Sequence, residues 1–326
     1  MHVAFLRLSA LGDVVMASSV VKHLARHNPE VTIDWITDRG FSELWNLPEN
    51  VKVVGVDKVR SLQGFWKLKR MFSHLSYDFV FVAQASSSAH LAAMQLKGKK
   101  IGFDSIRGKE GHRFFVDETV PFLKNHLMEG YLSIARMLKQ ENLSRLDMDT
   151  LRLDALPWVE TNLPPRYLVF CPVSRQREKN YPFERYIDIF ERFEEVPIVV
   201  CGGNSAFDRR FENMYAKVKN VIFLAGKTDL MQLFAIIKRA ACVVAPDSGP
   251  IHIANNLGVP VISLFGATSS HASGPYLQQH YAIDVYEESR RRYGLSSDRF
   301  HRIRKKGVMN PIHPNRIIES LSQLIS

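Results

Sequence analysis

Short apolar runs, each followed by a polar loop and a stretch of helical periodicity, recur along the chain. These runs are rich in Val, Ile and Phe. Strands of this kind, separated by helices, are typical of a parallel sheet that helices cover on both faces. The predicted strands span 3–8, 31–36, 51–54, 79–83, 100–103, 168–172, 197–202, 221–225, 242–245 and 261–266.

The pattern stops between Leu156 and Pro165, where proline, acidic and polar residues interrupt it, and then restarts. A chain of 326 residues exceeds what one core usually organises, so two domains of roughly 150 residues each are expected. We predict an α/β protein with two Rossmann-like domains in tandem, residues 1–160 and 161–326. Since ligands of open α/β sheets bind at the carboxyl ends of the strands, we expect the domains to face each other across a central cleft that holds the site.

Composition and net charge indicate which kinds of partner the protein can bind. The formal net charge is +10, 46% of the residues are hydrophobic, and the three cysteines are Cys171, Cys201 and Cys242. Each cysteine lies in or beside an apolar run and no Cys-x-x-Cys pair occurs, so we expect buried, reduced thiols.

The N-terminal apolar run is too short for a signal peptide, and no apolar run reaches roughly 18 residues, the length of a membrane-spanning helix. The charge indicates an anionic partner: nucleic acid, an acidic membrane surface or a phosphorylated substrate.

The segment Ser9-Ala10-Leu11-Gly12-Asp13 directly follows the first predicted strand. A carboxylate at the start of the next helix would face the cleft and could accept the proton of an attacking hydroxyl. The same carboxylate could equally be an N-terminal helix cap. The residues alone leave both readings of Asp13 open.

A second polar loop, residues 172–182, follows the first strand of the second half. Ser174, Arg175 and Lys179 bring a hydroxyl, a guanidinium and an ammonium group into one loop. Such groups neutralise the charge that grows on a leaving diphosphate. A solvated charged loop that leads into a helix at Pro182 would have a similar composition.

A third polar segment, Asp247-Ser248-Gly249-Pro250-Ile251-His252, comes between an apolar run and a helix-like stretch. Ser248 and Gly249 can offer backbone N–H groups to a phosphate at a helix N-terminus, Asp247 can cap that helix or hold a ligand hydroxyl, and His252 would project from its first turn. No Gly-x-Gly-x-x-Gly follows the first strand, which disfavours a dinucleotide site. We find no metal-ligand cluster and no trustworthy catalytic triad spacing.

Basic residues gather beside Phe65 and Trp66 and again near the C-terminus. The first group could form an amphipathic surface that meets anionic lipid headgroups. Nucleic-acid binding stays open, although no recognised nucleic-acid module accompanies the charge. The first group comprises Lys58, Arg60, Lys67, Lys69 and Arg70; the others lie in 290–293 and 302–306.

The order of these motifs resembles that of the ADP-heptose:lipopolysaccharide heptosyltransferases, glycosyltransferase family 9, over nearly the whole chain. One departure is Ala83-Gln84-Ala85-Ser86-Ser87, where the family commonly has an Asp and a Gly. The matching segments are 9–15, Ser174-Arg175 with Lys179 and Pro182, Gly226-Lys227-Thr228 with Leu230, 247–252, and 265–268.

This resemblance implies a GT-B fold and an inverting, metal-independent glycosyl transfer from ADP-L-glycero-D-manno-heptose, without a cofactor. Asp13 matches the proposed general base. The implied donor-binding residues are Ser9, Gly12, Ser174, Arg175, Lys179, Asp208, Thr228, Asp247, Ser248, Gly249 and His252. Among them, Ser174 and Lys179 match positions that hold the phosphates, Asp208 lies near the spacing of a ribose ligand, and Thr228 near a residue that touches the base.

The resemblance further implies work on the lipopolysaccharide inner core, peripherally at the cytoplasmic face of the inner membrane. We expect Kdo, or phospho-Kdo, of Kdo–lipid A as the acceptor, with Lys58 and Arg60 contacting it, because the first domain is basic. Three alternatives remain: a later core heptose as acceptor, another nucleotide sugar as donor, or a non-catalytic, basic polyanion-binding protein. Nucleic acid is not an expected partner.

Overall fold

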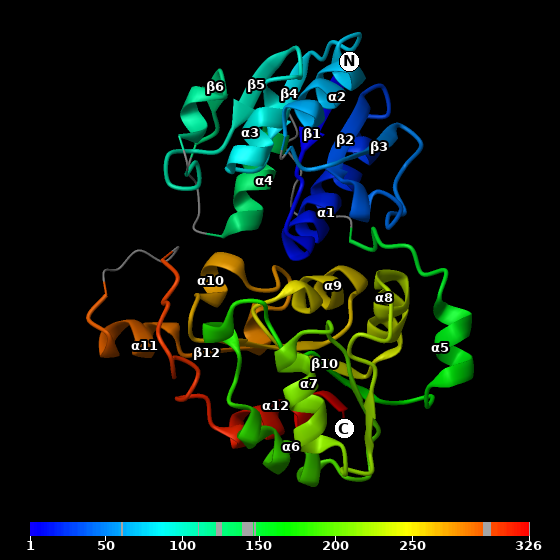
Figure 1. The fold of residues 1–326 in the computed structure, drawn as a ribbon, viewed down its shortest axis with the longest axis vertical. Coiled ribbons are helices and arrows are strands. Elements are labelled where there is room, and N and C mark those ends of the chain that lie inside the picture. Colours follow the sequence, from blue (N-terminus) through cyan, green and yellow to red (C-terminus); the bar gives the residue numbers. More distant parts are fainter. Residues whose placement is uncertain are drawn as a thin grey trace. The chain divides into compact units, whose positions relative to one another are not determined.

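The computed structural model describes residues 1–59, 61–109, 111–121, 126–138, 146, 148–295 and 301–325. The chain divides into two compact units, Met1–Thr150 (unit 1) and Leu151–Ser326 (unit 2), each with its own sheet (Figure 1). The division falls about ten residues before the boundary that the sequence pattern predicts. Helix α5 (Leu156–Asn162) accounts for the difference, because it packs against α8 (Leu230–Arg239) of unit 2. Pro157 in its first turn begins a helix rather than marking a linker.

Unit 1 is built on a parallel sheet of six strands in the order β3-β2-β1-β4-β5-β6. The central strands β1 and β4 are almost fully buried, as continuous apolar runs require in a sheet covered on both faces. The strands are β1 (His2–Leu6), β2 (Thr32–Asp38), β3 (Val51–Val56), β4 (Phe79–Val82), β5 (Lys99–Gly102) and β6 (Glu118–Thr119).

The helices of unit 1 connect these strands. The long helix α1 is buried along most of its length and packs against α4. Two of its buried polar residues donate to backbone oxygens: Ser18 Oγ to Val15 O and Lys22 Nζ to Asp149 O, both at 2.7 Å. The helices are α1 (Leu11–His27), α2 (Leu62–Phe72), α3 (Ser87–Ala93) and α4 (Leu127–Arg136), with short 3-10 turns η1 (Arg39–Phe41) and η2 (His112–Phe114).

Unit 2 repeats the architecture with a second parallel sheet, ordered β12-β11-β10-β7-β8-β9. The short edge strands β6 and β12 are absent from the sequence prediction, because β6 is the polar pair Glu118-Thr119 and only Ile283 is buried in β12, so neither contains an apolar run. The strands are β7 (Leu168–Phe170), β8 (Ile198–Val200), β9 (Val221–Phe223), β10 (Cys242–Pro246), β11 (Val261–Phe265) and β12 (Ala282–Asp284).

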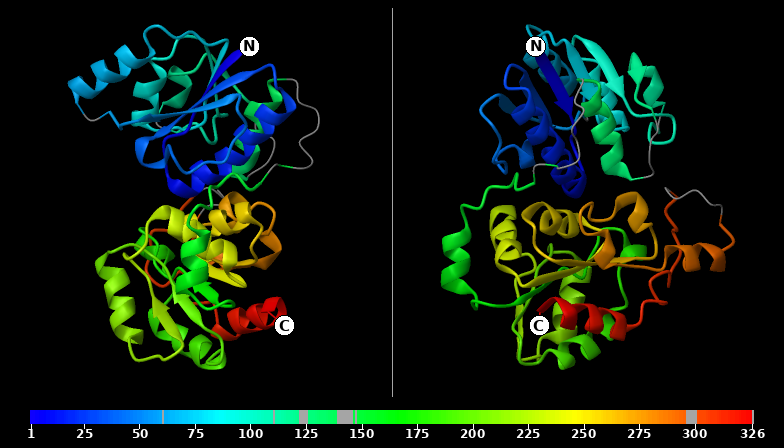
Figure 2. Two further views of the ribbon diagram at one scale, coloured as in Figure 1. Left: turned by 90° about the vertical axis from the view of Figure 1, so that its right-hand side faces the viewer. Right: turned by 180° about the vertical axis from the view of Figure 1, so that it is seen from behind.

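An aromatic cluster fills the core beneath α6 and α7. Phe190 packs edge-to-face on Phe170 at 5.2 Å and on Tyr215 at 5.1 Å between ring centroids, and Phe211 packs on Tyr186 in the same way. The remaining elements are α6 (Tyr186–Arg192), α7 (Ala206–Tyr215), α9 (Gly249–Leu257), α10 (Ser270–Ser273), α11 (Tyr286–Arg292), α12 (Pro314–Ile325) and the 3-10 turns η3 (Arg177–Lys179), η4 (Phe183–Arg185) and η5 (Gln279–Tyr281). The C-terminal helix α12 packs against α6 (Figure 2).

The expectation of buried thiols is confirmed. Cys171, Cys201 and Cys242 are free and buried. Burial raises the pKa of the Cys201 and Cys242 thiols to about 12, and that of Cys171 well above its ordinary value. Thiols held protonated in this way are packing groups rather than nucleophiles.

Each sheet is parallel throughout, so all loops that follow its strands emerge at one edge. In unit 1 this edge carries Arg7 to Asp13 after β1 and Ala83 to Ser86 after β4. In unit 2 it carries the loops after β7, β8, β9, β10 and β11. The polar residues predicted to bind a ligand therefore gather at one edge of their own sheet.

Candidate functional site

The carboxylate of Asp13 is anchored at the start of α1. It is the third residue of the helix, and its Oδ2 accepts a hydrogen bond from the Ala10 backbone N–H at 3.1 Å. The same oxygen lies 2.6 Å from Nη2 of Arg7. Asp13 thus caps the helix terminus, as one of its two interpretations predicts, and it also forms an ion pair that the sequence does not predict.

Arg7 is held more firmly than the carboxylate it binds. Its side chain is 8% exposed, against 28% for Asp13, and its Nη1 donates to Ala83 O at 2.7 Å. The guanidinium also lies 5.6 Å from the ring centroid of Tyr131. Burial acts to lower the pKa of Arg7, but the charge of Asp13, the interaction with Tyr131 and the hydrogen bond to Asp13 together outweigh it and raise this pKa above the ordinary value. Arg7 is therefore a permanent buried cation behind Asp13.

The two anchoring contacts leave the oxygens of Asp13 unequal. Within the part of the chain that the structure describes, both end on Oδ2, so Oδ1 is the oxygen available to take a proton. A partly exposed carboxylate with one oxygen held and the other open can accept a proton. The contacts are compatible with both interpretations of Asp13, as a helix cap and as a base.

Gln84 shapes the loop that carries Ser9. Its Oε1 accepts from the backbone N–H groups of Leu8 at 2.8 Å and Ser9 at 3.1 Å, and its Nε2 donates to Ser86 Oγ at 2.8 Å. From the sequence this stretch is only a departure from the family pattern, and the role of Gln84 is not predicted. A polar residue directly after the strand that neighbours β1 was the signal available.

In unit 2, Asp247 is the centre of a buried polar cluster. Its Oδ2 lies 2.6 Å from Lys179 Nζ, 2.5 Å from Thr268 Oγ1 and 3.4 Å from Ser273 Oγ. Burial acts to raise the pKa of Asp247, but the Lys179 ammonium, hydrogen bonds from Lys179 and Thr268, and the nearby His252 outweigh it and lower this pKa. The loops after β7, β10 and β11 are thereby tied together.

The α9 helix begins beside this cluster, and within the described part of the chain no side-chain hydrogen bond caps its N-terminus. Ser248 is its N-cap, yet the Ser248 hydroxyl donates back to Pro246 O at 3.0 Å and makes no capping bond. Asp247 does not cap the helix either, because Lys179 engages its carboxylate. The amides of Ser248 and Gly249 therefore head a helix dipole that favours an anion. His252 is buried in the first turn of this helix.

The loop after β7 is folded rather than simply solvated. The Ser174 amide donates to Asn180 Oδ1 at 2.7 Å, which closes the loop on itself and buries Ser174. Lys179 ends the 3-10 turn η3 and points to Asp247, whereas Arg175 is exposed. The solvated-loop alternative thus describes Arg175 but not Ser174 or Lys179.

Asp208 and Thr228 lie farther along the same sheet. Asp208 is buried and forms a capping box, with Oδ2 accepting from Ser205 N at 2.9 Å and from its Oγ at 2.5 Å. Its Oδ1 faces Gly202, where a Cβ would lie only 2.4 Å away. Thr228 is half-buried after β9, and β7 and β8 separate that strand from β10. The structure therefore places Asp208 at the strand ends but already engaged locally.

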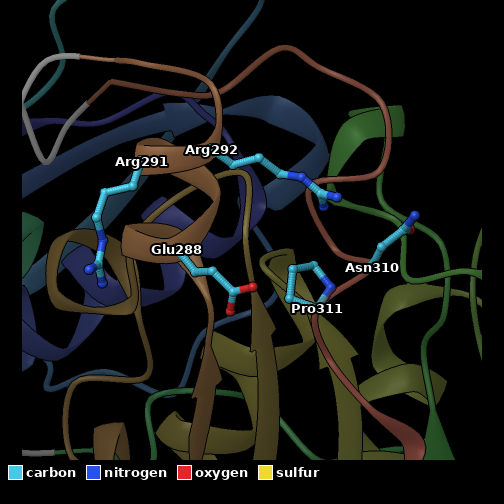
Figure 3. A pocket seen from close by; sticks show the side chains of 5 residues that line it. All are labelled: Glu288, Arg291, Arg292, Asn310 and Pro311. Carbon is cyan, nitrogen blue, oxygen red and sulfur yellow. The ribbon is translucent and has the colours of Figure 1, made fainter.

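The tentative acceptor residues lie on the other unit. Lys58 Nζ lies 3.5 Å from Asp38 Oδ2 in an exposed pair, and Arg60 falls outside the described residues. The hollow in Figure 3 contains neither the predicted donor-binding residues nor the predicted acceptor-binding residues. The residues that line it, beside α11, are Glu288, Arg291, Arg292, Asn310 and Pro311. In the described ranges no three His, Cys, Asp or Glu residues gather to hold a metal ion. Nor, within those ranges, is any helix both long and apolar enough to cross a bilayer.

Comparison with known proteins points to one family. The sequence profile of glycosyltransferase family 9 (heptosyltransferase) matches residues 65–294. The lipopolysaccharide core heptosyltransferase OpsX of Haemophilus influenzae is 27% identical, over 98% of this chain and 95% of its own length.

Solved structures agree on the fold. Escherichia coli ADP-heptose lipopolysaccharide heptosyltransferase II superposes with a TM-score of 0.73 at 19% identity, covering 100% of this chain and 98% of its own. The E. coli heptosyltransferase WaaC with ADP gives 0.69 at 17% identity, covering 99% and 97%. The predicted GT-B fold of two Rossmann-like α/β domains is confirmed.

Proposed function

We propose a specific reaction for this chain, which belongs to glycosyltransferase family 9, the heptosyltransferases, and is a glycosyltransferase of lipopolysaccharide biosynthesis. The enzyme moves L-glycero-D-manno-heptose from ADP-heptose to the Kdo, or phospho-Kdo, of Kdo–lipid A. The family match supports the heptose and its ADP carrier. The choice of Kdo over a later core heptose rests on the basic surface of unit 1.

Asp13 is the proposed general base. Its Oδ1 removes the proton of the acceptor hydroxyl while that oxygen attacks the anomeric carbon, and the bond from this carbon to the diphosphate oxygen breaks with inversion. Arg7 and the Ala10 amide hold Oδ2 meanwhile. Since a carboxylate is a weak base for a sugar hydroxyl, proton removal must accompany bond breaking rather than precede it.

The polar edge of unit 2 is the proposed donor site. Lys179 and the amides of Ser248 and Gly249 present positive charge to the diphosphate that departs as ADP. Ser174, Arg175 and His252 complete this phosphate and sugar region, and Asp208 and Thr228 are the proposed contacts for the adenosine. Ser9 and Gly12 are also proposed to contact the donor. The observation that carries the proposal is the joining of Lys179, Asp247 and Thr268 beside the α9 N-terminus.

We place the enzyme peripherally on the cytoplasmic face of the inner membrane, where a lipid-borne acceptor lies within reach. Lys58 and Arg60 are the proposed contacts for acceptor phosphates. Both belong to the cationic segment around α2, whose charge complements a phosphorylated lipid.

Two measurements test the reaction. Thermal shifts with ADP, UDP and GDP should show selective stabilisation by ADP, and a UDP-selective shift would reject the ADP donor. Single-turnover assays with ADP-heptose should transfer heptose to Kdo–lipid A. Transfer only to an already heptosylated core would reject the Kdo acceptor but keep the family reaction. Salt-sensitive polyanion binding without any transfer would favour the non-catalytic alternative.

A further inference from the structure

Helix α2 is exposed in a way that folding does not explain. Of its eleven residues only Leu68 and Phe72, one turn apart, are buried. In Figure 2 (left) it is the light-blue helix at the outer edge of unit 1. The Ser61 side chain caps its start by accepting from Gly64 N at 3.2 Å, so the helix is formed and presents a fixed outer surface.

That outer surface carries large apolar side chains. Leu62 is 80% exposed, Trp66 is 60% exposed and Met71 is 39% exposed. Leu62 and Trp66 are four residues apart and hence neighbours on one face of the helix. A Trp and a Leu held side by side in water lose stabilising burial unless another surface covers them.

The charged residues of α2 are all cationic. Between Leu62 and Phe72 there are Lys67, Lys69 and Arg70 and no acidic residue. Lys69 Nζ lies 4.8 Å from the Trp66 ring centroid, so charge and aromatic face occupy one spot. Lys67 is 70% exposed although it pairs with Asp57, which Arg39 also binds.

This combination has a specific complement. Aromatic and aliphatic side chains with Lys and Arg at their border match the headgroup level of a bilayer that carries negative lipids. An acidic protein surface could pair with the cations, but the exposed Leu62 and Trp66 beside them also need apolar contact, and a bilayer with negative headgroups offers both. Charge complementarity therefore favours lipid.

We propose that α2 is a membrane-docking helix that inserts Leu62 and Trp66 at the headgroup level of an anionic bilayer, with Lys67, Lys69 and Arg70 against the lipid phosphates. This proposal rests on the proposed function for the kind of membrane. It adds to that function the helix, α2, and the side chains that contact the lipid.

Vesicle sedimentation tests the inference with the full-length chain. The wild-type protein should bind vesicles of phosphatidylglycerol and phosphatidylethanolamine at least tenfold more strongly than neutral phosphatidylcholine vesicles, and high salt should weaken this binding. The double variant Leu62→Ser/Trp66→Ser should lose at least tenfold of the binding to anionic vesicles. Fluorescence of Trp66 should shift to the blue on binding.

A matched control is available on the same unit. Phe114 is 77% exposed, with Arg113 5.1 Å from its ring centroid, so Phe114→Ser removes an exposed aromatic next to a cation outside α2. This variant should bind vesicles like the wild type. Absence of wild-type binding to anionic vesicles, or equal loss in both variants, would overturn the inference. The inference would also be overturned if the wild type formed a concentration-dependent dimer that the Leu62→Ser/Trp66→Ser variant no longer formed, because α2 would then bind a second copy of the chain.

Failure of the reaction is distinguishable from failure of the docking helix. The Leu62→Ser/Trp66→Ser variant should keep its thermal shift with ADP and its transfer to a deacylated, soluble acceptor. If that transfer is absent in the wild type while vesicle binding follows α2, the proposed reaction fails and the membrane inference stands. If the variant transfers normally and also binds anionic vesicles normally, the membrane inference is rejected.

Discussion

Replacing Arg7 by Met should slow heptose transfer while leaving the fold and ADP binding nearly intact. The substitution keeps an unbranched side chain against Tyr131 but removes the 2.6 Å contact to Asp13 Oδ2 and the 2.7 Å bond to Ala83 O. Asp13 then keeps only the 3.1 Å bond from the Ala10 amide, and its carboxylate can rotate away from the attacking hydroxyl.

The size of the effect follows from the bond that is lost. A hydrogen bond to a charged group contributes about 1.5–3 kcal/mol. If this orientation matters only when the proton moves, kcat should fall by roughly tenfold to a hundredfold. The KM for ADP-heptose should change little, because Arg7 contacts Asp13 and Ala83, whereas most of the proposed donor residues, Lys179 and Asp247 among them, belong to unit 2. Arg7→Lys keeps the charge without the fork and should lose less.

Steady-state release of ADP, with a thermal shift by ADP as the binding check, measures both quantities. Arg39→Met is the matched control, since Arg39 forms an exposed ion pair with Asp57 in the same unit and such pairs contribute little. Unchanged kcat in folded Arg7→Met would refute the positioning role. Equal losses in the two Met variants, or loss of the ADP shift in Arg7→Met, would refute the separation of roles.

Three further predictions concern stability and the donor site. Lys179→Met leaves the buried Asp247 carboxylate without its cation. The free energy of unfolding, measured by urea denaturation, should therefore fall by about 3 kcal/mol. The thermal shift with ADP should disappear, and a normal shift would reject Lys179 as a phosphate ligand. Burial, together with the nearby His90, lowers the pKa of His112 from about 6.5 to about 4. Between these two pH values the unfolded chain therefore binds more protons than the folded protein. The free energy of unfolding is highest above pH 6.5 and falls as the pH decreases toward 4. His112→Gln can still accept from the Phe103 amide, 3.0 Å away in the wild type, so its unfolding free energy should fall less than that of the wild type between pH 7 and pH 5; parallel curves would contradict this. Phe190→Ala should cost about 3–5 kcal/mol because it opens a cavity in the aromatic core, and a loss below about 1 kcal/mol in urea denaturation would show that the core collapses to fill it.

The fold follows from the sequence where apolar runs are continuous. Strands such as β1, β4, β10 and β11 lie within a residue or two of the predicted ranges, because burial on both faces requires an unbroken apolar run. The edge strands β6 and β12 lack such a run, because β6 is Glu118-Thr119 and only Ile283 is buried in β12. A proline such as Pro157 can mark a linker or begin a helix, and only the packing of α5 on α8 decides between the two.

The candidate site was predictable in its loops but not in its contacts. Residues after parallel strands must emerge at one edge, so Asp13, Lys179 and Asp247 could be named from their positions. Which oxygen of Asp13 is held, and by what, depends on Arg7, a charged residue at the end of a buried strand. Gln84 and Ser273 act from distant parts of the chain. Tertiary pairing of this kind leaves no periodic signal in the sequence.

Single-turnover transfer from ADP-heptose by the wild type and by Asp13→Asn tests the central claim most directly. Asparagine preserves the size of the side chain and can still accept from the Ala10 amide, but it cannot take up a proton. The wild-type enzyme should form the heptosylated acceptor and release ADP, whereas Asp13→Asn should bind ADP almost unchanged and form no product. Product formation by Asp13→Asn at a rate near that of the wild type would contradict the account.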